Sequence, residues 1–151
     1  TLKDGFVQGE FSAETFEKFD QSVAVMVAED NGIVFGYLCS SRLESTKGMP
    51  LTDFLSDLLK SVSLEGVPLM QSRCVITGPI CLAHDQRGKG LFEQLYSALF
   101  EEIRSNFDIA VAFVESENPR SLAAHIKKLD MKVVKNYDFN GRNYDLIARK
   151  I

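Results

Sequence analysis

Apolar residues recur along this chain with the period of a helix in several places. Between 51 and 62 they return every three or four positions and form one stripe (Leu51, Phe54, Leu55, Leu58, Leu59 and Val62). Over 91–104 two such rows run side by side, which predicts a helix with a broad buried face. A further helix is expected after Asn118-Pro119, and a short one is expected to begin at Ser12.

Two pairs of apolar runs predict β-hairpins. Each pair flanks an Asn-Gly dipeptide, and these residues tolerate the positive φ angles of a tight hairpin turn. The pairs are 22–29 with 33–41 around Asn31-Gly32, and 132–139 with 142–149 around Asn140-Gly141.

The runs 74–83 and 109–116 are the expected centre of the sheet. The second, "IAVAFVE" in its first seven residues, is apolar without alternation, as in a strand covered on both faces. The first is interrupted by Gly78-Pro79; because proline cannot donate to a ladder, this pair predicts a bulge or a local parting of strands. Strand, helix, parallel strand, helix and hairpin together predict an α/β fold, a mixed sheet with helices on both faces. We expect one domain over 1–151, although a full N-terminal strand and helix are hard to find before Ser22.

Composition narrows the class of protein. The chain has 17 basic and 21 acidic residues and a formal charge of −4, which argues against a nucleic-acid or anionic-membrane binder. No apolar run approaches the roughly 18 residues of a membrane span. Cys39, Cys74 and Cys81 show no CxxC spacing and lie in strand-like runs, so we expect reduced thiols, a cytoplasmic protein and no metal site.

The segment "DQRGKGLF" (85–92) joins the strand 74–83 to the helix 91–104. The first turn of a helix has N–H groups without helical partners and a partial positive charge. Gly88 and Gly90 let a ligand approach the backbone, and Arg87 and Lys89 add positive charge, so the loop suits a phosphate or pyrophosphate. The alternative is that the glycines only turn the chain and the basic residues are solvated. The spacing fits neither a Walker loop nor the GxGxxG dinucleotide fingerprint.

Two motifs carry a resemblance to a known family. Arg87-Gly88-Lys89-Gly90-Leu91-Phe92 resembles the Arg/Gln-x-x-Gly-x-Gly/Ala loop of the GNAT family of N-acetyltransferases. "NPRSLAAH" (118–125) resembles the second motif of that family, in which an Asn is followed seven residues later by a Tyr or a His. The resemblance covers 22–150 and is concentrated in 74–131. It implies the GNAT fold, with two parallel strands that splay apart, and transfer of an acetyl group from acetyl-CoA to a primary amine in a ternary complex.

The resemblance also implies a binding site for the cofactor. The pantetheine would hydrogen-bond to the exposed strand edge, and the pyrophosphate would take the backbone N–H groups of the loop, with Arg87 beside them and Asn118 touching the cofactor while it caps its helix. The residues implied are Ile80, Cys81, Leu82, Arg87, Gly88, Lys89, Gly90, Leu91, Phe92, Glu93 and Asn118. Phe92 stands where the family has Gly or Ala, so its side chain must turn away from the cofactor and join the packed face of its helix.

Three residues are candidates for the chemistry. The backbone N–H of Leu82 would donate to the thioester carbonyl. His125, at the position of the family's tyrosine, would protonate the sulfur of CoA; the alternative is a helix-face histidine bonded to backbone. Glu115 would act as a base through water, or is a solvated carboxylate at a strand end. Cys81 is expected to be a packed thiol, because direct attack of the amine on the thioester needs no nucleophile from the enzyme.

The acceptor is open at this stage: a small-molecule amine and a protein or peptide amine both fit, and a homodimer stays open. The helix 51–62 and its flanks, Glu44 and Glu65 among them, are expected to help select the acceptor. Two other classes stay open as well: a catalytically silent acyl-CoA-binding module, and a structural protein that binds phosphate but leaves Asn118 and its helix unexplained.

Overall fold

The computed structural model describes residues 12–151, so residues 1–11 of the predicted domain lie outside the described part. Helices are interspersed among the strands of the described chain. Their bounds are α1 Ala13–Ser22, β1 Ala24–Asp30, β2 Ile33–Ser41, α2 Pro50–Leu58, β3 Ser63–Leu64, β4 Val67–Pro68, β5 Cys74–Leu82, α3 Leu91–Ile103, β6 Ile109–Glu115, α4 Pro119–Leu129, β7 Lys132–Phe139 and β8 Arg142–Lys150.

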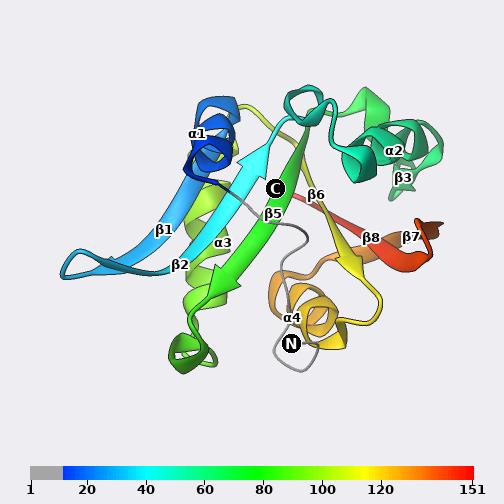
Figure 1. Ribbon diagram of the computed structural model, residues 1–151. Helices are drawn as coiled ribbons and strands as arrows, with labels where there is room; N and C mark the ends of the chain where they lie inside the picture. The colour runs from blue at the N-terminus through cyan, green and yellow to red at the C-terminus, as the bar shows by residue number, and fades with distance from the viewer. Residues whose placement is uncertain (1–11) are drawn as a thin grey trace.

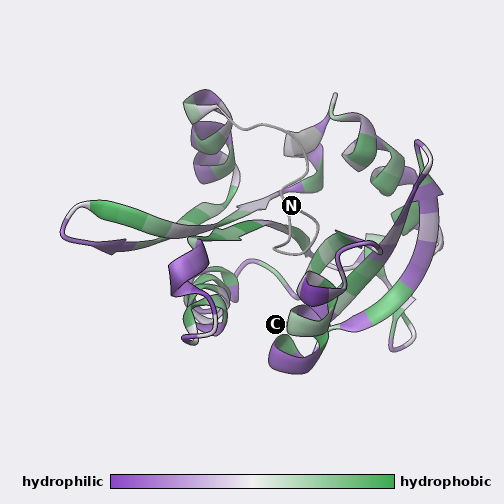
Figure 2. Ribbon diagram, turned by 60° about the horizontal axis from the view of Figure 1, so that its bottom comes forward, coloured by the Kyte–Doolittle hydropathy of each residue, from purple (hydrophilic) through white to green (hydrophobic). Residues whose placement is uncertain are grey.

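The main sheet has the order β1-β2-β5-β6-β8-β7, and β3 pairs separately with β4. Within the main sheet β5 and β6 are parallel and every other neighbouring pair is antiparallel. Helices α1 and α2 lie on one face, and α3 and α4 lie on the other (Figures 1 and 2). The predicted mixed α/β fold with helices on both faces is therefore confirmed.

Each face of the sheet has its own hydrophobic core. On the α3/α4 face, Leu95 and Leu99 of α3 pack with Leu38, Ala110 and other strand residues. On the α2 face, the core joins α2 and its C-terminal turn to the strands; its members include Leu55, Leu59, Ile76, Val111 and Leu146. Successive strand residues therefore alternate between the two cores, which is why β6 is apolar without a break.

The predicted boundaries needed two corrections. The first strand starts at Ala24 rather than Ser22, because Ser22 ends α1. The helix expected over 51–62 is α-helical only over Pro50–Leu58 and continues as a 3₁₀ turn over Leu59–Ser61. The apolar stripe keeps its buried face through that turn. Both Asn-Gly hairpins are confirmed; in the first, Asn31 and Gly32 have φ angles of 50° and 78°.

The parallel strands β5 and β6 pair along only part of their length. The register holds for Cys74↔Ile109, Val75↔Ala110 and Ile76↔Val111 and then ends, while β6 stays paired with β8 as far as Glu115. On its other side β5 has a bulge: Ser40 pairs with Thr77 and Leu38 with Ile80, so Gly78 and Pro79 face one residue of β2. The bulge and the parting of strands predicted from Gly78-Pro79 are both present.

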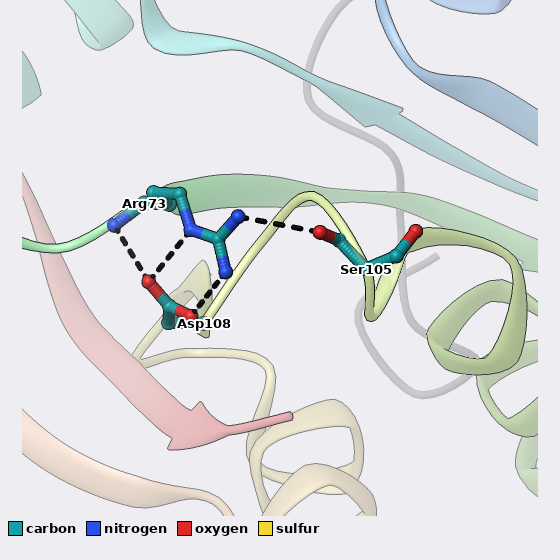
Figure 3. A network of polar contacts seen from close by, with 3 residues as sticks. All are labelled: Arg73, Ser105 and Asp108. Atoms are coloured by element: carbon teal, nitrogen blue, oxygen red, sulfur yellow. Dashed lines mark hydrogen bonds and ion pairs between the residues drawn. The ribbon is translucent and has the colours of Figure 1, made fainter.

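A polar clamp holds the paired end of these two strands. Arg73, just before β5, donates from Nε and Nη2 to the two carboxylate oxygens of Asp108, just before β6, at 3.0 and 2.8 Å (Figure 3). Its Nη1 donates to the carbonyl of Ser105 at 3.2 Å, and its own carbonyl accepts the Asp108 N–H at 2.8 Å. The strands are thus fixed where they meet and free to diverge beyond Ile76.

Candidate functional site

A cavity of about 370 Å³ lies where β5 and β6 diverge. It extends to both faces of the sheet. On the α3/α4 face its lining includes Tyr96, Ala112, Val114, Asn118, Ser121 and His125. On the α1/α2 face it includes Phe19, Ser41, Met49, Pro50, Leu51, Thr52, Phe113, Glu115, Phe139 and Tyr144. The floor is the β5 segment from Ile76 to Ile80.

The open edge of β5 presents backbone amides toward β6. The N–H of Ala83 donates to the Phe35 carbonyl of β2 at 2.8 Å. Because N–H groups alternate sides along a strand, the amides of Ile80 and Leu82 point away from β2, and that of Cys81 points toward it. Ile80 lines the cavity, whereas Leu82 and Cys81 lie outside its lining. Of the predicted edge residues, Ile80 is therefore nearest the cavity.

The predicted anion loop leads directly into a helix. After a 3₁₀ turn over His84–Gln86, Gly88 and Gly90 take φ angles of 76° and 81°, and α3 begins at Leu91. Gly90 is the N-cap residue, and its carbonyl accepts the Gln94 N–H at 3.1 Å. The amides from Gly88 to Glu93 therefore belong to a loop and a first helical turn, where no intrahelical acceptor is available to them.

Phe92 turns into the protein, as predicted. Its ring packs against the α3/α4 core, 5.0 Å from the ring of His125 and 5.2 Å from that of Tyr96 (centroid to centroid). The bulky residue at this position of the loop therefore supports the α3–α4 contact and leaves the backbone of the loop accessible.

His125 is buried, 3% exposed, and both of its ring nitrogens have partners. Nδ1 lies 2.7 Å from the carbonyl oxygen of Ser121, and Nε2 lies 2.8 Å from the hydroxyl of Tyr96. Since a carbonyl only accepts, Nδ1 holds the proton of the neutral ring, and Nε2 accepts from Tyr96. Burial lowers the pKa of His125, an effect that the hydrogen bond to Ser121 partly opposes, so the neutral ring is favoured.

Tyr96 connects His125 to the floor of the cavity. Its hydroxyl lies 3.3 Å from Thr77 Oγ1 on β5; because Tyr96 donates to His125, Thr77 is the donor in this second bond. Burial raises the pKa of Tyr96, so this hydroxyl keeps its proton. Thr77, Tyr96 and His125 thus form a hydrogen-bonded series along one wall of the cavity.

Glu115 and Asn118 lie at the open end of β6. Glu115 is buried, and its Oε2 is 3.2 Å from Nη1 of Arg142, so it is not the solvated carboxylate considered as the alternative. Asn118 caps α4: its side chain accepts the Ser121 N–H at 3.4 Å, and its own N–H donates to the Glu115 carbonyl at 2.8 Å. The predicted N-cap is confirmed.

The two carboxylates named beside the helix 51–62 do not line the cavity. Glu44 and Glu65 are not among the residues that line the cavity, and Glu65 pairs with Lys132 and Lys150 at 2.7 and 3.0 Å. The start of α2, from Met49 to Thr52, does line it. Tyr96, Thr77 and Ser41 could not be singled out from the sequence: Tyr96 stands in an apolar helical row, and the isolated hydroxyls of Thr77 and Ser41 carry no pattern of their own.

Neither a metal cluster nor a membrane helix is found in the described part of the chain. No group of three or more His, Cys, Asp or Glu side chains among residues 12–151 is placed to hold a metal ion. In the same residues, no helix has the length and apolar character needed to cross a membrane.

The fold is that of the GNAT-family acetyltransferases. No family model and no curated protein matches the sequence. Among solved structures, a GNAT family acetyltransferase from Elizabethkingia anophelis with acetyl-CoA bound aligns with a TM-score of 0.59 at 11% identity, over 93% of this chain and 84% of that one. The ribosomal-protein-alanine N-acetyltransferase from Brucella melitensis aligns with a TM-score of 0.55 at 19% identity, over 84% of this chain and 68% of that one. The smu.2055 protein from Streptococcus mutans aligns with a TM-score of 0.61 at 17% identity, over 91% of this chain and 75% of that one. The fold predicted from the two motifs is confirmed.

Proposed function

We propose that this protein is an N-acetyltransferase that uses acetyl-CoA and acetylates a primary amine by direct attack in a ternary complex. The observation that carries the proposal is the end of the β5–β6 pairing at Ile76. Beyond Ile76, the edge of β5 that faces β6 is unpaired, and the cavity lies beside it. The chain then leads through the glycine loop into the start of α3. These are the surfaces needed by the thioester, the acceptor and the diphosphate.

The backbone supplies most of the proposed cofactor contacts. The amides of Ile80 and Leu82 face the open edge and suit the carbonyl groups of a pantetheine arm. The amides from Gly88 to Glu93 suit a diphosphate, with Arg87 and Lys89 adding positive charge. Acetyl-CoA supplies a thioester carbonyl that is open to attack and a thiol leaving group. The amide that donates to this carbonyl is that of Leu82 or, nearer the cavity, that of Ile80.

The transfer needs two proton movements. The amine nitrogen forms a bond to the acetyl carbon, the carbon–sulfur bond breaks, the amine loses a proton and the sulfur gains one. Glu115 would accept the amine proton through water. His125 would act through Tyr96: a protonated Nε2 passes its proton to the Tyr96 oxygen while Tyr96 gives its own to the sulfur. Because the resting ring is neutral, this step first requires a second proton on the ring, at Nε2; burial makes that charged imidazole a stronger acid.

A silent acyl-CoA-binding module is the second candidate, and the hydrogen bonds of His125 favour it. In the neutral tautomer the ring has no N–H directed at the cavity, since Ser121 and Tyr96 occupy both nitrogens. Such a module would bind acetyl-CoA with every contact described above and release no thiol.

Unfolding midpoints and thiol release distinguish these functions. A ligand that binds only the native state raises the midpoint. We expect acetyl-CoA and CoA to raise it and ATP at the same concentration to leave it unchanged. We then expect thiol release from acetyl-CoA that depends on an added amine. A midpoint shift without amine-dependent release identifies the silent module, and the absence of any shift with acetyl-CoA refutes both.

The same proposal includes a cytoplasmic location, which the cysteines support. Cys39, Cys74 and Cys81 are free thiols, and burial raises the pKa of Cys39 to about 12 and that of Cys74 to about 11. Unreactive, reduced thiols of this kind support a cytoplasmic protein.

A further inference from the structure

The hydroxyl of Ser41 is buried in the cavity wall without a hydrogen bond. Ser41 ends β2, is 1% exposed and lines the cavity. Its Oγ has no partner among residues 12–151. A buried hydroxyl that loses its contact with water is destabilising unless a new partner replaces that contact. This hydroxyl therefore points to a partner that is bound in the cavity.

Ser40, its neighbour, shows what a structural serine looks like at this place. Ser40 is fully buried, and its Oγ donates to the carbonyl of Ala24 at 2.7 Å. Side chains alternate along a strand, so Ser40 shares the α3/α4 face with Leu38, and Ser41 points to the α1/α2 face. The unpartnered hydroxyl thus lies on the side of the cavity opposite His125.

The wall around Ser41 is apolar. Besides Met49, Pro50 and Thr52, the lining of the α1/α2 face has five large apolar or aromatic side chains, which are Phe19, Leu51, Phe113, Phe139 and Tyr144. Glu115 is the one carboxylate among the described lining residues, and Arg142 already pairs with it at 3.2 Å. A polyamine or aminoglycoside would bring several charges against a wall whose single carboxylate already has a partner. The wall suits a single amine on an apolar body.

The strand register places the two ends of such a molecule. Ser41 pairs with Ile76, and Ile76 pairs with Val111, at the closed end of the opening. Ile80 and Glu115 each lie four residues further along their strands, at the open end. At about 3.3 Å per residue, the two ends are offset by about 13 Å along the strand direction. An amine that reacts beside Ile80 and Glu115 can therefore reach Ser41 with its far end.

We propose that the acceptor is a small primary amine with one positive charge, an apolar body and a hydrogen-bonding group at its far end, which Ser41 binds. This inference rests on the proposed acetyl transfer. The amine lies toward Glu115, the apolar body lies against the aromatic wall, and the far polar group exchanges a hydrogen bond with Ser41 Oγ. Specificity then comes from both the wall and the hydroxyl.

A matched pair of amines tests the role of the hydroxyl. Tyramine and 2-phenylethylamine differ only by the hydroxyl at the far end of the ring, and spermidine is the polycationic comparison. We expect kcat/KM from thiol release to be highest for tyramine and lowest for spermidine. In Ser41→Ala we expect kcat/KM for tyramine to fall about 2- to 12-fold, through KM, as for the loss of one neutral hydrogen bond. The value for 2-phenylethylamine should stay unchanged.

Ser40→Ala is the control variant. Because it removes a satisfied buried bond, it should lower the unfolding midpoint and leave the ratio of the two amines unchanged. Ser41→Ala should leave the midpoint unchanged or raise it, since it removes a buried group without a partner. A functional loss without a loss of stability is a result that a structural serine would not give.

The inference and the proposed function fail in different ways. If Ser41→Ala affects both aromatic amines equally or neither, or if spermidine is the best acceptor, the inference is overturned while acetyl transfer stands. If no amine is acetylated, the proposed function fails. The inference about Ser41 is then tested only by the binding of tyramine. A midpoint shift with tyramine in the presence of CoA that is lost in Ser41→Ala supports it, and the absence of that shift in the unsubstituted chain overturns it.

Discussion

Replacing Gly88 by alanine should weaken the binding of acetyl-CoA while leaving the fold intact. Gly88 has a φ of 76°, and a Cβ added there meets no atom within 4 Å. The substitution therefore acts through the backbone alone. For a residue with a Cβ, the left-handed conformation costs about 1–2 kcal/mol. Gly88 is exposed, so an alanine in its place is free to leave that conformation in the unliganded protein.

The size of the effect follows from this cost. If diphosphate binding needs the left-handed turn, the bound state must restore it, and the Kd rises by about 5- to 30-fold. Calorimetric titration with acetyl-CoA and with CoA measures this change directly. The two ligands should lose affinity equally, because they share the diphosphate.

Gly141→Ala is the matched control. Gly141 has a φ of 75° and equally open surroundings, but it lies in the β7–β8 turn. The same backbone cost there should lower the unfolding midpoint and leave the Kd unchanged. The reasoning is refuted if Gly88→Ala binds acetyl-CoA as tightly as the unsubstituted protein, or if Gly141→Ala weakens binding by the same factor.

Other consequences of the structure can be measured by unfolding. Because the pKa of His125 is lowered in the native state, the unfolded chain binds a proton at a higher pH than the native chain does. The free energy of unfolding should therefore fall as the pH drops below about 6.5. In unfolding midpoints measured from about pH 8 to about pH 5, His125→Gln should flatten this slope. Arg73 lowers the pKa of Asp108, so the clamp stabilises the protein above about pH 4, and this contribution is lost as the pH falls through the native pKa. Asp108→Asn should lose this acid dependence, and the paired amides of β5 and β6 should exchange faster in it. Unchanged amide exchange in Asp108→Asn would contradict the role of the clamp. Leu55→Ala, at a position with no exposed surface, should cost about 2–5 kcal/mol in urea unfolding, whereas Phe54→Ala, at 37% exposure, should cost clearly less.

The fold could be predicted because its signals are local. Helical periodicity places α3 within one residue of its end, and each Asn-Gly pair has a positive φ at both positions of its turn. The Gly78-Pro79 interruption located the bulge and the opening, since proline removes a ladder donor wherever it occurs. The end of α2 could not be predicted, because a 3₁₀ turn keeps the same apolar stripe buried.

The site was only half visible in the sequence for a different reason. The glycine loop and the Asn118 cap are local motifs, but the partners of His125 come from 4 and 29 residues away. Tyr96 lies in an apolar row, where a core phenol and a hydrogen-bonding phenol have the same pattern. Ser40 and Ser41 are identical neighbours, and only the pairing of β2 decides which one is satisfied and which one faces the cavity.

The opening in the sheet is stable because each diverging strand keeps one partner. Up to Leu82, β5 remains paired with β2, and β6 remains paired with β8 up to Glu115, so each strand loses hydrogen bonds on its inner edge only. An unpaired inner edge is destabilising unless water or a ligand satisfies it. The clamp between Arg73 and Asp108 holds the two strands together at their paired end. A ligand that satisfies the open amides of Ile80 and Leu82 therefore stabilises the sheet as well as binding to it, and acetyl-CoA should slow amide exchange in β5 beyond Ile76 more than before it.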